Sequence, residues 1–177
     1  MRDCARMLLR ARTTDDIDAL CRLVRVIHES DGYPTLLRDD VQNFVVTTNC
    51  LAAWVCERDH RVVGHIALHT VWSNEVAGLA ASALGRTRES LASVSRLFVE
   101  AEWRRRGVAG RLLGIATSEA HERGLWPVLD VVTTYASAVA LYEREGWVRL
   151  GAIALPMPDG QLIDEYVYAA PSPEASS

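Results

Sequence analysis

Residues 92–132 constrain the fold most, because they alternate between strand and helix patterns. The run ASVSRLFV at 92–99 is typical of a strand, and PVLDVV at 127–132 reads as a short buried strand. Between them lies one helical face that ends at Gly124 and carries Val108, Leu112, Ile115, Ala116 and Ala120. This alternation predicts a sheet with helices packed on its faces.

The remaining patterns extend the same architecture. Further strands are predicted at 4–12, 50–57, 62–72, 147–155 and 162–169. Helices are predicted behind the capping cluster at 13–16, over 39–46, and around 138–142 before Gly146. Residues 73–90 are rich in Ala, Gly and Ser without a clear period, which predicts a loop that can include a helical turn. The sum is an α/β (α+β) fold with a mixed sheet.

Length, charge and cysteines limit the class of protein. The 177 residues fit one domain, expected over 1–170, with a disordered tail at 171–177. Nineteen basic and twenty-three acidic residues give a net charge of −4, which argues against a general nucleic-acid binder. We expect no membrane span or signal peptide, and therefore a cytoplasmic protein. The four cysteines lack ligand spacing, so buried free thiols are favoured over a metal site or a disulfide.

The densest positive charge stands where a helix is predicted to begin. Arg104, Arg105 and Arg106 run directly into Gly107-Val108-Ala109-Gly110. Cations are unfavourable at a helix N-terminus, but a bound anion reverses that cost, and small residues let the backbone approach it. The stretch lacks the GxxxxGK[ST] and GxGxxG patterns of other phosphate loops. It therefore indicates either an anion-binding turn or a solvated basic loop.

Two motifs in this part of the chain resemble the GNAT superfamily of N-acetyltransferases. RLFVEAEWRRRGVAGRLL resembles the acyl-CoA motif of that family, a strand followed by Q/R-x-x-G-x-G/A at a helix start. SAVALYEREGW at 137–147 resembles its A-x-x-L-Y-x-x-x-G-F segment. The resemblance implies a mostly antiparallel sheet of six to seven strands flanked by about four helices.

The resemblance also implies roles for matched positions. The backbone of Leu97, Phe98 and Val99 would pair with the pantetheine arm of acetyl-CoA, and the N–H groups of 105–110 would hold the pyrophosphate. Arg104 would belong to the same cofactor-binding segment. Tyr142 would be the general acid that protonates the leaving thiolate. Asp130 stands where some members place a catalytic glutamate. Tyr135 stands where the family often has an asparagine that contacts the cofactor, so that contact is not carried over.

Residue types alone do not identify the general base. An acid inside the apolar run PVLDVV is either a base with a pKa raised by burial or a structural group paired with backbone or arginine. Ser93, Ser95 and His69 are other candidates for the base or a relay. No metal is needed for the reaction.

The acceptor side is predicted from residues 28–40, which the family places opposite the cofactor. Asp31, Tyr33 and neighbouring acids form an acidic, aromatic-edged rim that suits a cationic amine, or they belong to an ordinary polar loop. His69 is a further candidate for this side.

The first hypothesis is an N-acetyltransferase that moves the acetyl group to a small cationic amine in a ternary complex. The alternatives are a peptide N-terminal or lysine acetyltransferase, an acyl-CoA sensor without turnover, and a plain anion-binding module. The expected partners are acetyl-CoA and an amine. Nucleic acid and membranes are not expected as partners, and a homodimer stays open as the assembly.

Overall fold

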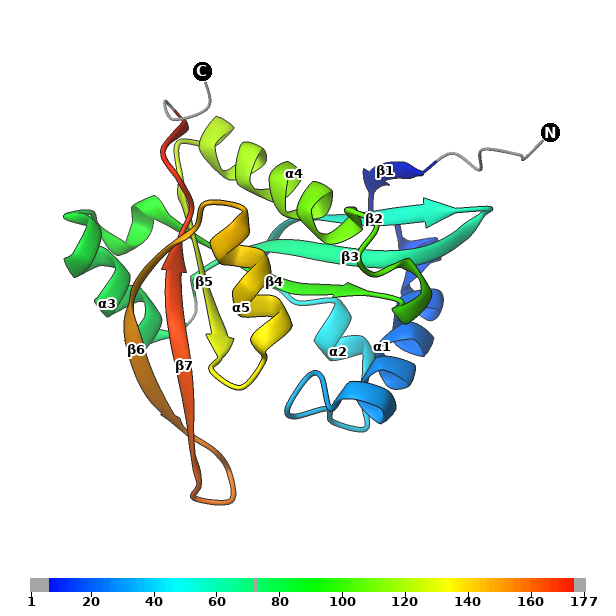
Figure 1. The fold of residues 1–177 in the computed structure, drawn as a ribbon, viewed down its shortest axis with the longest axis horizontal. Helices are drawn as coiled ribbons and strands as arrows, with labels where there is room; N and C mark the ends of the chain where they lie inside the picture. Colours follow the sequence, from blue (N-terminus) through cyan, green and yellow to red (C-terminus); the bar gives the residue numbers. More distant parts are fainter. Residues whose placement is uncertain (1–6, 72, 174–177) are drawn as a thin grey trace. The chain divides into compact units, whose positions relative to one another are not determined.

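The described part of the computed structural model, residues 7–71 and 73–173, contains a seven-stranded sheet (Figure 1). Its order is β1-β2-β3-β4-β5-β7-β6. The β4–β5 pair is parallel, whereas the β1–β2, β5–β7 and β6–β7 pairs are antiparallel. The predicted mixed, mostly antiparallel sheet of six to seven strands is therefore confirmed. The strands are β1 (Leu8–Ala11), β2 (Cys50–Arg58), β3 (Arg61–Thr70), β4 (Leu91–Val99), β5 (Trp126–Val132), β6 (Val148–Pro156) and β7 (Leu162–Ala169).

Five α-helices occur in the described residues, against about four predicted. They are α1 (Ile17–Asp31), α2 (Gln42–Val45), α3 (Asn74–Leu84), α4 (Val108–Glu122) and α5 (Ala136–Arg144). The additional helix is α3, so the prediction of a loop at 73–90 is wrong over most of that segment.

The sequence of α3 hides its period because small residues occupy both its buried and its exposed positions. Ser73 caps the helix by accepting a hydrogen bond of 3.2 Å from the Val76 N–H, and Gly85 ends it with φ 62°. The helix approaches the sheet closely at a glycine of β6. A Cβ on Gly151 of β6 would lie 3.0 Å from the Leu79 side chain of α3.

The chain divides into two compact units. The first comprises 1–68 and 96–116, and the second comprises 69–95 and 117–177. The expectation of one domain over 1–170 stays a prediction. The expected tail begins at Pro171, but residues 174–177 lie outside the described part.

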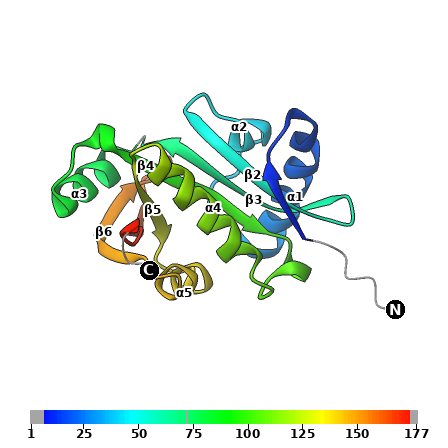
Figure 2. The same cartoon turned by 90° about the horizontal axis from the view of Figure 1, so that it is seen from above.

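In the first unit, the apolar face of α1 packs with α2 on one side of β2 (Figure 2). Leu20, Val24 and Ile27 recur at helical spacing and are buried with Val45 of α2 and Val55 of β2. The helix ends at Asp31, and Gly32 follows it in a left-handed conformation with φ 70°.

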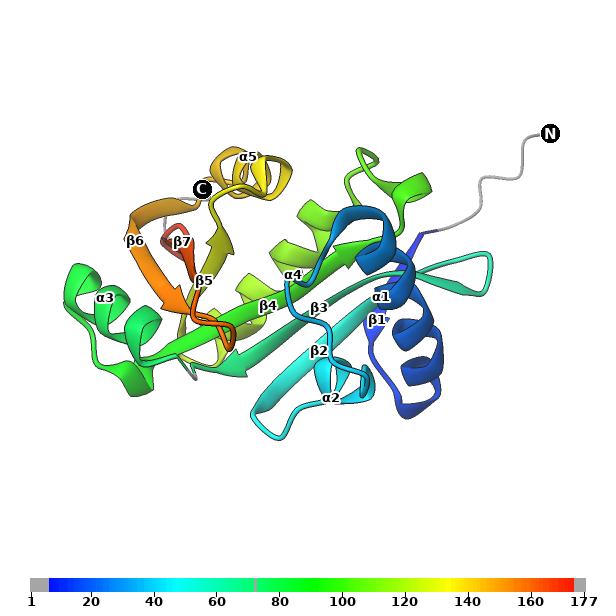
Figure 3. The ribbon, with the colours of Figure 1, turned by 90° about the horizontal axis from the view of Figure 1, so that it is seen from below.

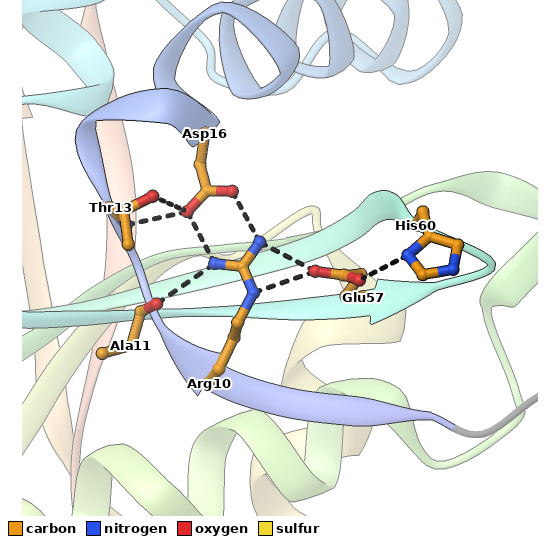
Figure 4. Close-up of polar contacts among 6 residues, drawn as sticks. All are labelled: Arg10, Ala11, Thr13, Asp16, Glu57 and His60. Atoms are coloured by element: carbon orange, nitrogen blue, oxygen red, sulfur yellow. Dashed lines mark hydrogen bonds and ion pairs between the residues drawn. The ribbon is translucent and has the colours of Figure 1, made fainter.

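Arg10 fastens β1 to the start of α1 and to β2 (Figure 4). Its guanidinium donates two hydrogen bonds to Asp16, of 2.7 and 2.8 Å, and a third of 2.9 Å to Glu57. The Thr13 N–H and hydroxyl also donate to Asp16, at 2.7 and 3.1 Å. These donors, above all Arg10, lower the pKa of Asp16 to about 2.

In the second unit, α3 and α5 lie on opposite faces of β5, β7 and β6 (Figure 3). Val128 and Val167 face α3, while Tyr168 faces Tyr142 of α5 at 6.0 Å between ring centroids. The antiparallel register pairs Asp130 with Val167 and Val132 with Glu165. Because side chains alternate along a strand, Asp130 and Glu165 share the α3 face.

Candidate functional site

The anion turn, residues 104–110, leads into α4 in the first unit and includes the first three residues of that helix. Arg105 and Gly107 adopt left-handed backbone conformations, with φ 59° and 80°. The Arg111 N–H donates to the Gly107 carbonyl at 3.1 Å. The N–H groups of Val108, Ala109 and Gly110 therefore precede the helical ladder, at the end of α4 that favours anions. Alternating left-handed residues also concentrate N–H groups in a concave turn.

The arginines of this turn have different surroundings. Arg104 donates from Nε to the Val99 carbonyl at 2.9 Å, and its guanidinium forms an ion pair with Asp31. The hydrogen bond from Arg104 lowers the pKa of Asp31. The structure thus joins a predicted cofactor residue to a predicted acceptor residue. Arg106 instead lies over the Trp103 ring, 5.1 Å from its centroid.

The segment Leu97-Phe98-Val99 closes β4. Phe98 and Val99 are buried, and Phe98 stacks on His65 with 5.1 Å between ring centroids. The Tyr33 ring packs near the Phe98 ring, with 6.5 Å between centroids, within the apolar cluster around α1. Just before the segment, Arg96 has φ 55°, a left-handed conformation inside a strand. The motif alone could not reveal this conformation, since arginine does not favour it.

Asp130 and Glu165 form a pair of hydrogen-bonded carboxyl groups, here called the acid pair, in the second unit. Burial raises the pKa of Asp130, and burial together with the Asp130 charge raises the pKa of Glu165. Glu165 Oε2 is buried and lacks a hydrogen-bond partner in the described chain. The sequence suggested a backbone or arginine partner for Asp130, and a second acid was missed. The spacing of Glu165, Val167 and Ala169 on one face of 162–169 was the available signal.

Tyr142 is buried on α5. Its ring centroid lies 6.1 Å from that of Trp147 and 6.0 Å from that of Tyr168. Burial, and to a lesser extent the negative charge of Asp130, raises its pKa. The phenol therefore keeps its proton at neutral pH.

The three other candidates for the base lie on β3 and β4. His69 is fully buried, and its Nδ1 is hydrogen-bonded to the Ser95 hydroxyl at 2.9 Å. Ser93 is buried two residues earlier on β4. His69 is thus enclosed by the protein, and its assignment to the acceptor side stays a prediction.

Neither a metal cluster nor a membrane span is found in the described residues. Within 7–71 and 73–173, three or more His, Cys, Asp or Glu side chains do not gather where they could hold a metal ion. The helices in these ranges are too short or too polar to cross a bilayer.

The comparisons with known proteins bear on both motifs. The model of the acetyltransferase (GNAT) family matches residues 17–147, which include the anion turn and Tyr142. The chain belongs to the GNAT acetyltransferase family. An acetyltransferase of Agrobacterium fabrum is 31% identical over 90 residues, which are 51% of this GNAT chain and 64% of that relative.

Solved GNAT-like structures share the fold over most of the chain. NAA60 of Arabidopsis thaliana, in complex with acetyl-CoA, gives a TM-score of 0.70 at 19% identity, covering 93% of this chain and 97% of its own. The ribosomal-protein-S18-alanine N-acetyltransferase of Escherichia coli gives 0.67 at 18% identity, with 94% of each chain covered. At such identities the likeness shows the fold alone.

Proposed function

We propose that this GNAT protein transfers the acetyl group of acetyl-CoA to a primary amine. The observation that carries the proposal is the left-handed turn at Arg105 and Gly107 before α4, inside the range matched by the family model. That turn supplies the N–H groups a pyrophosphate requires.

The cofactor side of the proposal consists of two segments. The backbone of 97–99 pairs with the pantetheine arm, and the N–H groups of 105–110 hold the pyrophosphate. Arg104 contributes by holding the turn to the Val99 carbonyl and Asp31. Arg105 and Arg106 supply charge toward the cofactor phosphates.

The chemical step is direct attack without a covalent enzyme intermediate. The nitrogen lone pair of the neutral amine forms a C–N bond with the thioester carbonyl carbon, and the C–S bond then breaks. Asp130 accepts the proton that the amine loses, and Tyr142 donates a hydrogen bond to the departing sulfur. Because burial holds the Tyr142 pKa far above that of a thiol, hydrogen-bond donation is favoured over complete proton transfer. The proton that Asp130 accepted then passes to the sulfur, so the products are an amide and free CoA thiol and the base is regenerated.

The acceptor is proposed to be a small cationic amine. Glu29 is exposed near the end of α1, and Asp39 and Asp40 are exposed shortly before α2. Asp31 is instead paired with Arg104. A screen for acceptors should include peptide N-termini as well as small amines, because the E. coli neighbour is named for acetylating a ribosomal protein's alanine.

Two measurements test this function. Calorimetry should detect acetyl-CoA binding, and its absence at millimolar ligand would refute both the enzyme and the sensor. A panel of amines and peptides, monitored by release of free CoA, distinguishes the enzyme from the sensor.

In the active enzyme, Tyr142→Phe should lower turnover by about 10²-fold or more while cofactor affinity is kept. Unchanged turnover would remove Tyr142 from the mechanism.

A further inference from the structure

We infer that Glu165 is a positioning residue that carries a proton and donates it as a hydrogen bond to the Asp130 carboxylate. This inference rests on the proposed function, in which Asp130 is the general base. Glu165 lies outside the range that the family model matches, 17–147.

The strand register brings the two acids together. Asp130 stands opposite Val167 and Glu165 stands opposite Val132, so the acids are diagonal neighbours on one face of an antiparallel pair. Long side chains can meet at such diagonal positions. Because two ionised carboxylates cannot hydrogen-bond to each other, their hydrogen bond requires one proton between them.

The surroundings place that proton on Glu165. Its Oε2 is buried and has no hydrogen-bond partner among the described residues, a position that is costly for a charged oxygen and less costly for a neutral acid. Asp130 has a backbone hydrogen bond in addition to the one from Glu165, and both favour its ionised form.

Within 7–71 and 73–173, no Arg or Lys side chain is found to act on the pKa of either acid. Tyr142 of α5 acts electrostatically on Asp130, and Ile153 of β6 stands opposite Glu165. The α3 residues packed on this face are apolar, and Glu75 at the helix start is exposed. Ser93 and Ser95 of β4 follow Leu91 at two-residue spacing on the same face, with His69 of β3 bonded to Ser95. Glu165 is therefore the acid that can tune Asp130 through a direct hydrogen bond.

Two variants distinguish hydrogen-bond donation by Glu165 from a role in which its side chain only fills space. Glu165→Leu removes the donor, so the acidic limb of the kcat/KM profile should move upward by about one to two pH units. Glu165→Gln keeps an N–H donor of the same shape and should leave that limb near its wild-type position. An unmoved limb in the leucine variant, or equal movement in both variants, would overturn the inference.

Infrared difference spectroscopy supplies a readout that needs no acceptor. At pH 7 the wild-type protein should show the C=O stretch of a protonated carboxyl group, and Glu165→Gln should lose it. A wild-type protein without that band would overturn the inference even if it acetylates amines. If every amine fails as a substrate, the proposed function falls, but the band still decides whether the pair shares a proton.

Discussion

Two regions of the molecule bury a carboxylate, and they give it opposite partners. Asp16 in the first unit receives two hydrogen bonds from Arg10, whereas Asp130 in the second unit is bonded to another acid. The pKa of Asp16 falls and the pKa of Asp130 rises. Burial raises the pKa of both groups. At Asp16 the hydrogen bonds from Arg10 outweigh burial, whereas at Asp130 the hydrogen bond from Glu165 lowers the pKa by less than burial raises it.

This difference separates a group that stabilises the fold from one suited to chemistry. An Asp ionised throughout the working pH range can hold β1, β2 and α1 together, but it cannot exchange protons there. A carboxyl group with a raised pKa can take up a proton near neutral pH, as a general base must. The same residue type thus serves two purposes, and asparagine substitution at each position tests the distinction.

The largest expected effect is on turnover. Asp130→Asn removes the proposed base and should lower kcat/KM for a good amine acceptor by about 10²- to 10⁴-fold. Asp16→Asn, the same chemical change in the other region, should leave kcat/KM near the wild-type value under conditions where both variants are folded. Steady-state release of CoA measures both. Equal losses in the two variants would mean that Asp130 acts through folding and not through chemistry.

The next effect is on stability and its dependence on pH. Because the folded-state pKa of Asp16 is lowered from 3.8 to about 2, its stabilisation is present at neutral pH and lost as pH falls from about 4 towards 2. Asp16→Asn should therefore cost about 2 kcal/mol of unfolding free energy at pH 7 and much less at pH 2.5. Urea unfolding at both pH values measures this. A cost independent of pH would show that the Arg10 interaction is not its source.

The sequence predicted the strands and the helices that have a clear apolar stripe, since those signals are local. It missed α3 because Ala, Gly and Ser leave little contrast between the helix faces. Asp130 stood out because an acid interrupts the apolar run at 127–132. Its partner Glu165 did not stand out, because the contact between the two acids depends on pairing between strands about thirty-five positions apart in the sequence. The ion pair between Asp31 and Arg104 is equally non-local, and each residue alone suggested a different ligand.

The smallest expected effect comes from Asp31, which has a cationic partner as Asp16 does but is more exposed. Its side chain is 35% exposed and that of Arg104 is 39% exposed, against 6% for Asp16. Solvent screens such a pair, so Asp31→Asn should cost less than about 1 kcal/mol of unfolding free energy, and added salt should reduce the cost further. Urea unfolding at low and high salt, with Asp16→Asn measured in parallel, gives the comparison. If the two variants lose equal stability, the arginine contact alone would set the stabilisation. A smaller loss at Asp31 would show that a carboxylate gains most from its arginine where water is also excluded.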